Sequence, residues 1–519
     1  MGQLNMTKNP ALSVAMAVFC AAVAIPVLSV AQHDTDHRQA RYRLIDLGTF
    51  GGVTSYINPV GNGGPYMNGK GMVVGSSMTS IPIPPNQNGY PCPSPPDEVF
   101  HAMQWGLSGV TELQSLGLSS DCGNALAIND RGETVGTSEN GKLDPATGVL
   151  QVRAVMWKDG HIRNLGTLGG NHSFASAIND RRQIVGFALN KIPDPFSLFD
   201  FGIGGFTNGT QTRAFLWHEG QMQDLGTLGG PDAWATFVNE PGQIAGYSYT
   251  NSIPNQTTGI PTVNPFIWTK DAGMIDLGSL GGTFGLPVGL NNRGQAIGIS
   301  NLAGDGNADP FLWDGRELID MFTAGIGGNF LFANGINDVG EVIGAATFQN
   351  HPFDAAIWRS GVVTDLGALP GDCFSQAFVM NSRGQIAGNS ATCDGSTIRA
   401  ALWEDGRVFD LNTHISGSSD LLLVEANAIN DRGEIAGNGF PTGCTDFSCT
   451  HAYVLIPCDH SNDEECDDTR QNRAGTMASE VVPSNQRSAN VDRIPSAEIV
   501  KRMRRRSSQD RFLGAWPRK

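Results

Sequence analysis

The sequence predicts an all-β protein built from a repeated unit, and three observations support this. Glycine accounts for 66 of the 519 residues, about twice its usual share, and each glycine inside a helix would cost about 1 kcal/mol. The chain is 40% hydrophobic and only 16% charged, so it can bury a core. An Asn-x-x-Gly-x-x-x-Gly pattern also recurs along most of its length. Together these features exclude a disordered chain, collagen and an all-helical protein.

The recurring pattern predicts a β-hairpin in each repeat. Asn can hydrogen-bond to the backbone of its own turn, and the glycine three residues later supplies the positive φ that closes it. Only the third copy departs from the rule. It has Arg182 in place of that glycine, so Arg182 is expected to hold a positive φ at a cost of about 1 kcal/mol, and Arg182→Gly to stabilise the protein. The eight copies begin at Asn68, Asn129, Asn179, Asn239, Asn291, Asn337, Asn381 and Asn430.

A second hairpin follows in each repeat and carries an aromatic residue at a fixed position. Residues 154–165 are an example, with Asp159-Gly160 as a tight turn between short apolar runs. One such aromatic per repeat is typical of a repeated core, although a row of tryptophans could also stack on sugars. The series is Trp105, Trp157, Trp217, Trp268, Trp313, Trp358, Trp403 and Tyr453.

Two hairpins make a four-stranded unit of about 45 to 50 residues, which is the size of a β-propeller blade with strands a to d. The last repeat lacks strand d, and a strand of that type, residues 42–48, precedes the first repeat. We therefore predict an eight-bladed propeller over residues 42–458 in which the N-terminal strand completes the last blade. Seven blades are the alternative. Residues 32–41 are predicted to be a linker, and residues 459–519 a mostly disordered polar and basic tail.

These repeats resemble the extracellular HAF repeat proteins, which are named for a His-Ala-Phe tripeptide on the third strand. The matching tripeptides begin at His101, Arg213 and His451, and the DLGTLGG block stands at residues 224–230 and, with Phe50 in place of its second Leu, at residues 46–52. The resemblance covers roughly residues 42–456. It implies export and a repeat fold, and it carries no assigned reaction or catalytic residue.

A secretory signal peptide is predicted at residues 1–31. Residues 11–30 are nearly all apolar or small, and Ser29-Val30-Ala31 has the form of a cleavage site. An uncleaved membrane anchor is the alternative, because about 20 apolar residues can span a bilayer. No later segment is apolar for long enough, so a secreted or cell-envelope protein with no transmembrane segment is expected.

Loss of Cys20 with the signal peptide would leave eight cysteines, and an even count in an exported chain favours disulfides. No Cys-x-x-Cys pair is present, which argues against a zinc site. Proximity in sequence suggests the pairs Cys373–Cys393, Cys444–Cys449, Cys458–Cys466 and, by remainder, Cys92–Cys122. The sequence does not determine this connectivity.

The net charge of −16 is unevenly distributed. Residues 470–519 hold 12 basic and 4 acidic side chains, a balance of +8, so the rest of the chain carries −24. An acidic body repels nucleic acid. We expect a monomer whose partner is an extracellular glycan or protein.

Loop lengths indicate which face of the propeller binds that partner. From the closing glycine to the aromatic residue, the eight intervals are 30, 21, 31, 22, 15, 14, 15 and 16 residues, so insertions concentrate in the b-to-c connections of blades 1 to 4. Loops on a rigid scaffold tolerate insertion and carry function. The aromatics there can bind a ligand or can pack over their own blade. The predicted ligand-binding residues are Tyr90, Phe196, Phe199, Phe201, Phe206 and Trp234.

Catalysis receives less support than binding. The predicted inner strands at residues 125–128, 174–178 and 376–380 lack histidine and carboxylates, and no G-x-S-x-G or H-E-x-x-H motif occurs. A carbohydrate-active hydrolase or lyase remains the alternative, with its acid and base among acidic residues of the long loops. No cofactor is expected, although residues 305–309 could offer oxygens to calcium. The acidic candidates are Asp97, Glu98, Asp194, Asp200 and Asp232.

Overall fold

The computed structural model describes residues 41–57, 64–84, 98–106, 109–146, 148–198, 209–349 and 353–458. All of them belong to one compact unit, Ala40–Lys519. The predicted signal peptide and tail lie outside the described residues, so these two predictions stay open. In the described ranges, no helix is long and apolar enough to cross a membrane.

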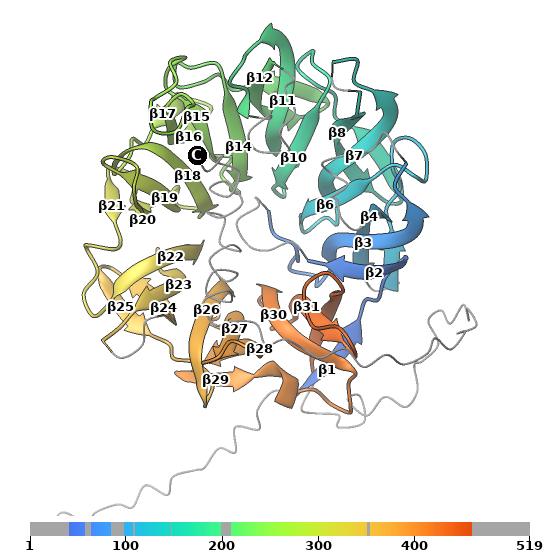
Figure 1. Ribbon diagram of the computed structural model, residues 1–519, viewed down its shortest axis with the longest axis vertical. Coiled ribbons are helices and arrows are strands. Elements are labelled where there is room, and N and C mark those ends of the chain that lie inside the picture. The colour runs from blue at the N-terminus through green and yellow to red at the C-terminus, as the bar shows by residue number, and fades with distance from the viewer. Residues whose placement is uncertain are drawn as a thin grey trace, which may run out of the picture. The chain divides into compact units, whose positions relative to one another are not determined.

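The strands of these ranges form eight four-stranded antiparallel groups, which we number as blades 1 to 8 in chain order. Figure 1 shows the blades following one another around a ring, each with its first strand innermost. A single parallel pairing of Val263 with Phe284 links blades 4 and 5 into one larger sheet. The predicted all-β propeller is therefore confirmed, with eight blades rather than seven.

Each blade of the first half uses four consecutive strands. Blade 1 contains β2 (Gly51–Tyr56), β3 (Val73–Pro82), β4 (Glu98–Gly106) and β5 (Gly109–Glu112). Blade 2 contains β6 (Gly123–Ile128), β7 (Thr134–Leu143), β8 (Leu150–Lys158) and β9 (His161–Asn164). Blade 3 contains β10 (Ser173–Ile178), β11 (Ile184–Pro193), β12 (Thr210–His218) and β13 (Gln221–Asp224). Blade 4 contains β14 (Ala233–Val238), β15 (Ile244–Tyr249), β16 (Val263–Thr269) and β17 (Gly273–Asp276).

The second half repeats this order until the last blade. Blade 5 contains β18 (Gly281–Leu290), β19 (Ala296–Leu302), β20 (Ala308–Trp313) and β21 (Leu318–Asp320). Blade 6 contains β22 (Asn329–Ile336), β23 (Val342–Thr347), β24 (Asp354–Arg359) and β25 (Val362–Asp365). Blade 7 contains β26 (Asp372–Met380), β27 (Ile386–Thr392), β28 (Ile398–Glu404) and β29 (Arg407–Asp410), followed by the 3-10 turn η1 (Leu411–Thr413). Blade 8 contains β30 (Leu421–Ile429), β31 (Ile435–Pro441), β32 (His451–Pro457) and β1 (Tyr42–Asp46).

The two ends of the propeller sequence close the ring. β1 pairs antiparallel with β32, with Tyr42 opposite Pro457 and Asp46 opposite Tyr453. In Figure 1 the blue N-terminal strand accordingly lies beside the red and orange strands of blade 8. The closure predicted from the missing fourth strand is therefore confirmed.

The a-to-b turns have the predicted local geometry and also join neighbouring blades. In most of them the Asn side-chain oxygen accepts backbone N–H bonds two and four residues later, as Asn129 does from Arg131 and Glu133. The Asn amide also donates to the backbone carbonyl of the corresponding Asn in the next blade, at 2.9 to 3.2 Å. The last of these bonds runs from Asn430 in blade 8 to Asn68 in blade 1. Seven such bonds among the described residues tie together the face that carries the tight turns.

Arg182 occupies the turn position that glycine holds elsewhere, and its φ of 59° confirms the predicted conformation. Its side chain crosses to blade 2, where Nε lies 2.8 Å from Oε1 of the fully buried Glu133. Burial raises the pKa of Glu133, but hydrogen bonds from Arg182, Lys158 and Asn129 outweigh that effect and hold the pKa at about 2. Arg182 therefore pairs with a buried carboxylate of the neighbouring blade, a role that comparing the eight turn sequences does not reveal.

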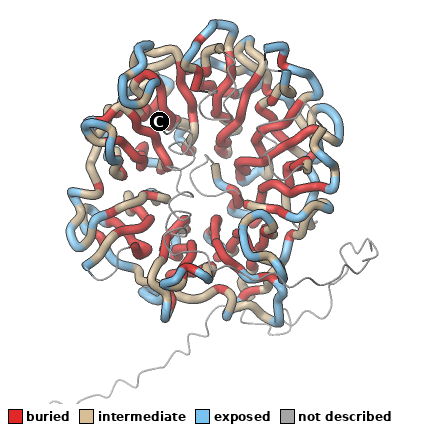
Figure 2. Tube along the Cα trace, viewed as in Figure 1, coloured by how far each residue is buried: buried red, intermediate tan, exposed pale blue. Residues whose placement is uncertain are grey.

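The hydrophobic core lies between the faces of adjacent blades. One cluster joins Val135 and Met156 of blade 2 to Ile184 and Phe215 of blade 3, and similar clusters join the following blades. Figure 2 shows the strands buried and the connections at their ends exposed. Five of the eight repeated aromatics are tryptophans buried to 6% exposure or less, which identifies the series as core rather than as a sugar platform.

Candidate binding face

The b-to-c and d-to-a connections lie on one face of the propeller, which we call the loop face. Two disulfides predicted from sequence are present there: Cys373–Cys393 and Cys444–Cys449. Cys122 and Cys458 are also disulfide-bonded. Their predicted partners, Cys92 and Cys466, lie outside the described residues, so those two pairings stay predictions. The two described disulfides stiffen this face at blades 7 and 8.

The predicted ligand-binding aromatics fall into two groups. Tyr90, Phe199, Phe201 and Phe206 lie outside the described residues. Phe196 is partly buried against the core. Trp234 is only 9% exposed, packs on Phe187 at a ring distance of 4.2 Å and donates from Nε1 to Ser176. Trp234 thus packs as a core residue and presents little of its ring to a ligand.

Two of the predicted acids come together at the base of the connection between β11 and β12, which we call the blade-3 loop. Asp194 follows β11 and Asp232 precedes β14, yet their carboxyl groups are within hydrogen-bonding reach of each other. Both are buried, with exposures of 4% and 0%. Asp97 and Asp200 lie outside the described residues, and Glu98 begins β4 in blade 1.

Backbone donors surround this carboxyl pair. Leu198 and Thr212 donate their N–H groups to the two oxygens of Asp232, at 2.5 and 2.9 Å. Phe196 N–H donates to Oδ1 of Asp194 at 3.0 Å. Oδ2 of Asp194 is buried and has no donor among the described groups. A proton shared by the two carboxyl groups would supply the missing hydrogen bond.

The electrostatics favour that shared proton. Burial raises the pKa of Asp232 well above its usual value, and the neighbouring charge of Asp194 raises it further. The two backbone donors lower it, but they do not cancel the effect. Burial and the Asp194 charge thus both disfavour ionisation of Asp232.

The same position in the preceding blade holds a different pair. Asp144 follows β7 and His172 precedes β10, with His172 Nε2 2.8 Å from Asp144 Oδ2. His172 Nδ1 accepts the N–H of Val152 at 3.2 Å, so the proton of a neutral imidazole sits on Nε2 and is donated to Asp144. Burial raises the pKa of Asp144, yet hydrogen bonds from His172 and Ala146 hold it below its usual value.

The junction between blades 1 and 2 has Cys122 at the corresponding position. Its N–H donates to Oε2 of Glu139 at 2.7 Å. Burial raises the pKa of Glu139 to about 8, and the charge of Asp121 adds to the rise. Three consecutive junctions thus use a disulfide-bonded cysteine, a histidine and an aspartic acid at one site of the repeat.

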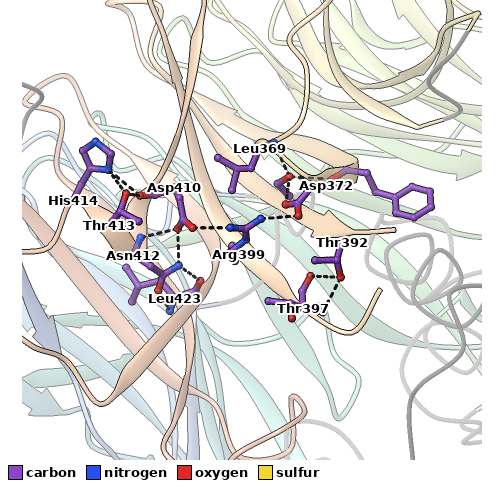
Figure 3. A network of polar contacts seen from close by, with 12 residues as sticks. Leu369, Asp372, Thr392, Thr397, Arg399, Asp410, Asn412, Thr413, His414 and Leu423 are labelled. Atoms are coloured by element: carbon purple, nitrogen blue, oxygen red, sulfur yellow. Dashed lines mark hydrogen bonds and ion pairs between the residues drawn. The ribbon is translucent and has the colours of Figure 1, made fainter. Parts of the chain in front are cut away.

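In blade 7 a partly buried ionic contact is made at a different position, on strand c, by Arg399, as Figure 3 shows. Arg399 lies between two carboxylates, with 2.6 Å from Nη2 to Asp372 and 3.1 Å from Nη1 to Asp410. Asn412 bonds to Asp410 and to both backbone groups of Leu423. Arg399 stands where the family tripeptide has histidine, and His101, Arg213 and His451 likewise pair with a carboxylate at the end of their neighbouring strand d. The tripeptide position therefore joins strands c and d.

Among the described residues, two hollows open on the loop face. One of about 400 Å³ in blade 8 lies between the turn after η1 and the connection held by Cys444–Cys449. Leu422 and Phe440 form part of its apolar wall, and Ser419, Asp420 and Thr442 contribute polar groups. A smaller one, of about 260 Å³, lies between blades 2 and 3 and includes Asp144 and Lys191. The blade 8 hollow has the size of a small-ligand pocket.

In residues 305–309, the segment predicted as a possible calcium site, one acidic side chain already accepts hydrogen bonds from the protein. The Asp305 carboxylate accepts bonds from the N–H and hydroxyl of Thr283, at 2.7 and 2.8 Å. Within the described ranges, no group of three or more histidine, cysteine or acidic residues could hold a metal ion.

No protein-family model and no curated protein matches this chain at the sequence level. Solved β-propellers are similar in structure. The propeller domain of the Trilobed protease from Pyrococcus furiosus has a TM-score of 0.38 and 10% identity, covering 72% of this chain and 95% of its own. The Dos1 propeller has a TM-score of 0.39 and 10% identity, covering 80% and 95%. The fold of this chain rests on its own strand pairing, and these similarities say nothing about its function.

Sequence reasoning missed the junction residues as a set. His172, Cys122 and Asp232 each stand seven residues before the turn Asn of their blade, so alignment on that Asn would have brought them into one column. Their aspartate partners, Asp144 and Asp194, each stand fifteen residues after the turn Asn of the preceding blade, so the same alignment would have brought them into a second column, whereas Glu139, which accepts from Cys122, lies in the same blade as Cys122. Alignment on the turn Asn would therefore have found both members of the Asp144–His172 and Asp194–Asp232 pairs.

Proposed function

We propose that the protein is a secreted, non-enzymatic binding or scaffold module whose loop face takes an extracellular polysaccharide or protein. The observation that carries the proposal is the contrast between the two faces. One face is a uniform set of tight turns joined by asparagines, whereas the other holds the disulfides Cys373–Cys393 and Cys444–Cys449, both described hollows and the variable connections. A rigid frame that displays variable loops is a common design for recognition. The resemblance to HAF repeat proteins supports the export part of the proposal.

The acids argue for binding over hydrolysis. Glycosidases hold their two carboxyl groups about 5 to 9 Å apart, with room for substrate or water. Asp194 and Asp232 are in contact, buried, and bonded to backbone donors of the loop base. These two residues therefore support the loop and are poorly placed to act as acid and base.

The blade 8 hollow, the larger of the two described, is the candidate site. Its apolar wall suits the C–H face of a sugar ring, and the exposed Asp420 carboxylate can accept hydroxyl groups. Phe440 is held in place by an edge contact with Phe447 at 5.0 Å. A polysaccharide is thus the ligand class that this hollow fits.

A glycan array probed with the full secreted chain tests the proposal, together with an assay for released reducing ends. We expect binding without product release, and weaker binding by at least tenfold in Asp420→Asn. Asp271→Asn, which changes an exposed acid in the c-to-d turn of blade 4, serves as the matched control and should bind normally. Released product would favour the hydrolase alternative, and binding unaffected by Asp420→Asn would move the site away from blade 8.

A further inference from the structure

The connection between β11 and β12 is held at its base by several buried polar contacts. Asp194 N–H donates to the Gly209 carbonyl at 2.5 Å, and the hydroxyls of Ser197 and Thr212 are 3.0 Å apart. Tyr249 donates its hydroxyl to the Phe196 carbonyl at 2.8 Å. The Asp194–Asp232 pair lies at the centre of these contacts and ties both ends of the loop to blade 4.

We propose that this carboxyl pair is a proton-operated latch: a proton shared by Asp194 and Asp232 holds the base of the blade-3 loop closed in acid, and loss of that proton loosens the base. The geometry carries the proposal. Three of the four carboxylate oxygens accept backbone N–H groups, and the fourth, Asp194 Oδ2, is buried beside the Asp232 carboxyl group without a donor among the described residues. Without the proton, two negative charges would be in contact away from water.

The direction of the pH effect follows from the sign of the shift. Burial and the Asp194 charge raise the pKa of Asp232 in the folded protein. A raised pKa means that the contribution to stability is complete below the ordinary aspartate pKa and is lost as the pH rises through the folded value. The latch therefore closes in acid and loosens toward neutral or alkaline pH.

Other titratable groups on the surrounding strands have their own contacts. Arg213 on β12 donates to the Pro231 carbonyl and pairs with Asp224 on β13. Tyr247 on β15 is buried against Trp234, and Lys191 on β11 is exposed. The neighbouring pair supplies an internal comparison, because His172 always carries the proton that Asp144 needs at neutral pH and above.

Asp194→Asn mimics the latched state permanently. The amide oxygen can keep the bond from Phe196, and the amide nitrogen replaces the oxygen that lacks a donor and donates to an ionised Asp232. No backbone donor loses its acceptor. Asp232→Asn also removes the shared proton, although its amide would face the N–H of Leu198.

Hydrogen exchange of the full-length protein between pH 4 and pH 9 tests the latch, with each rate divided by the intrinsic rate at that pH. We expect opening at the amides of Leu198 and Thr212 to rise by up to tenfold per pH unit within the titration range, and to stay flat in Asp194→Asn. The amides of Ala146 and Val152, at the sister pair, should show no such rise above neutral pH. These local readings exclude the titration of Glu139, which affects another junction.

Equal pH dependence in the wild type and Asp194→Asn would overturn the latch. Should Asp194→Asn fail to fold, Asp232→Asn gives the second test, because removal of either carboxyl group must abolish the pH dependence. The latch concerns regulation of the face proposed to bind ligand, but exchange is measured without ligand. A failed glycan array would therefore leave it standing, and a failed exchange test would leave the proposed binding untouched.

Discussion

The junctions before blades 3 and 4 each bury a pair of polar side chains at the same position of the repeat. The two pairs differ in which group supplies the proton of the hydrogen bond between them. In each, an aspartate after strand b meets a side chain just before the next strand a, and a strand c N–H bonds to that side chain. The first junction uses His172 and the second uses Asp232. A neutral imidazole carries an N–H group that can be donated, whereas an aspartate can donate only when its carboxyl group is protonated. The same backbone frame can therefore hold a pair whose hydrogen bond does not depend on pH above neutrality, or a pair whose hydrogen bond does.

Removal of the histidine should have the largest effect. His172→Ala leaves Asp144 Oδ2 without its donor and the Val152 N–H without its acceptor inside the protein. We expect a loss of about 3 kcal/mol in the free energy of unfolding, measured by urea titration at pH 7. His161→Ala, at an exposed histidine of β9, is the control and should lose little. A loss below about 1 kcal/mol would show that the pair contributes little.

Amide substitutions should act in opposite directions at the two junctions. Asp144→Asn points an N–H₂ group at the Nε2–H of His172, or forces the proton onto Nδ1 and strands the Val152 N–H. We expect a loss of about 2 kcal/mol, whereas Asp194→Asn should gain stability at pH 8. Melting of both variants in one buffer checks this contrast. Changes of the same sign would contradict the assignment of protons.

Exchange of one side chain should transfer the behaviour of one junction to the other. Asp232→His places an imidazole opposite Asp194, with Nδ1 available to Thr212 N–H as in the sister pair. We expect a gain of about 1 kcal/mol at pH 8 and a loss of similar size at pH 4.5, where the unfolded histidine is protonated. Unfolding of the variant and of the wild type at the two pH values measures whether the difference in stability changes sign. A variant that is less stable at both would mean that the site cannot accommodate the ring.

The smallest effect is expected on the opposite face, where a buried carboxylate depends on a permanent cation. Arg182→Gly relieves a positive φ but removes the pair with Glu133, so the gain expected from sequence should become a loss of about 0.5 kcal/mol. The low pKa of Glu133 contributes stability above its ordinary value that is lost as pH falls toward 2, so the deficit should shrink in acid. Thermal melts at pH 7 and pH 3 measure it, with Arg131→Ala as control. A stabilised variant would restore the original expectation.

The local features were predictable because they depend on nearby residues. Asn430, Gly433 and their six regular counterparts specify a hairpin through bonds within five residues, and an Asp-Gly pair sets the next turn. The orphan strand at residues 42–48 and the incomplete last repeat together predicted closure, which β1 and β32 confirm. Cys373–Cys393 and Cys444–Cys449 were close enough in sequence to be paired correctly.

The sequence by itself thus determined the strands, the turns, the blade count and the closure, because a repeat defines its own hairpins. Only the tertiary structure decided what each buried charge meets. Asp144 finds His172 28 residues away and Glu133 finds Arg182 49 residues away, across the boundary between blades. Those partners depend on which side chains the ring brings face to face, and burial then makes the choice matter, since an unpartnered charge inside a protein costs several kcal/mol.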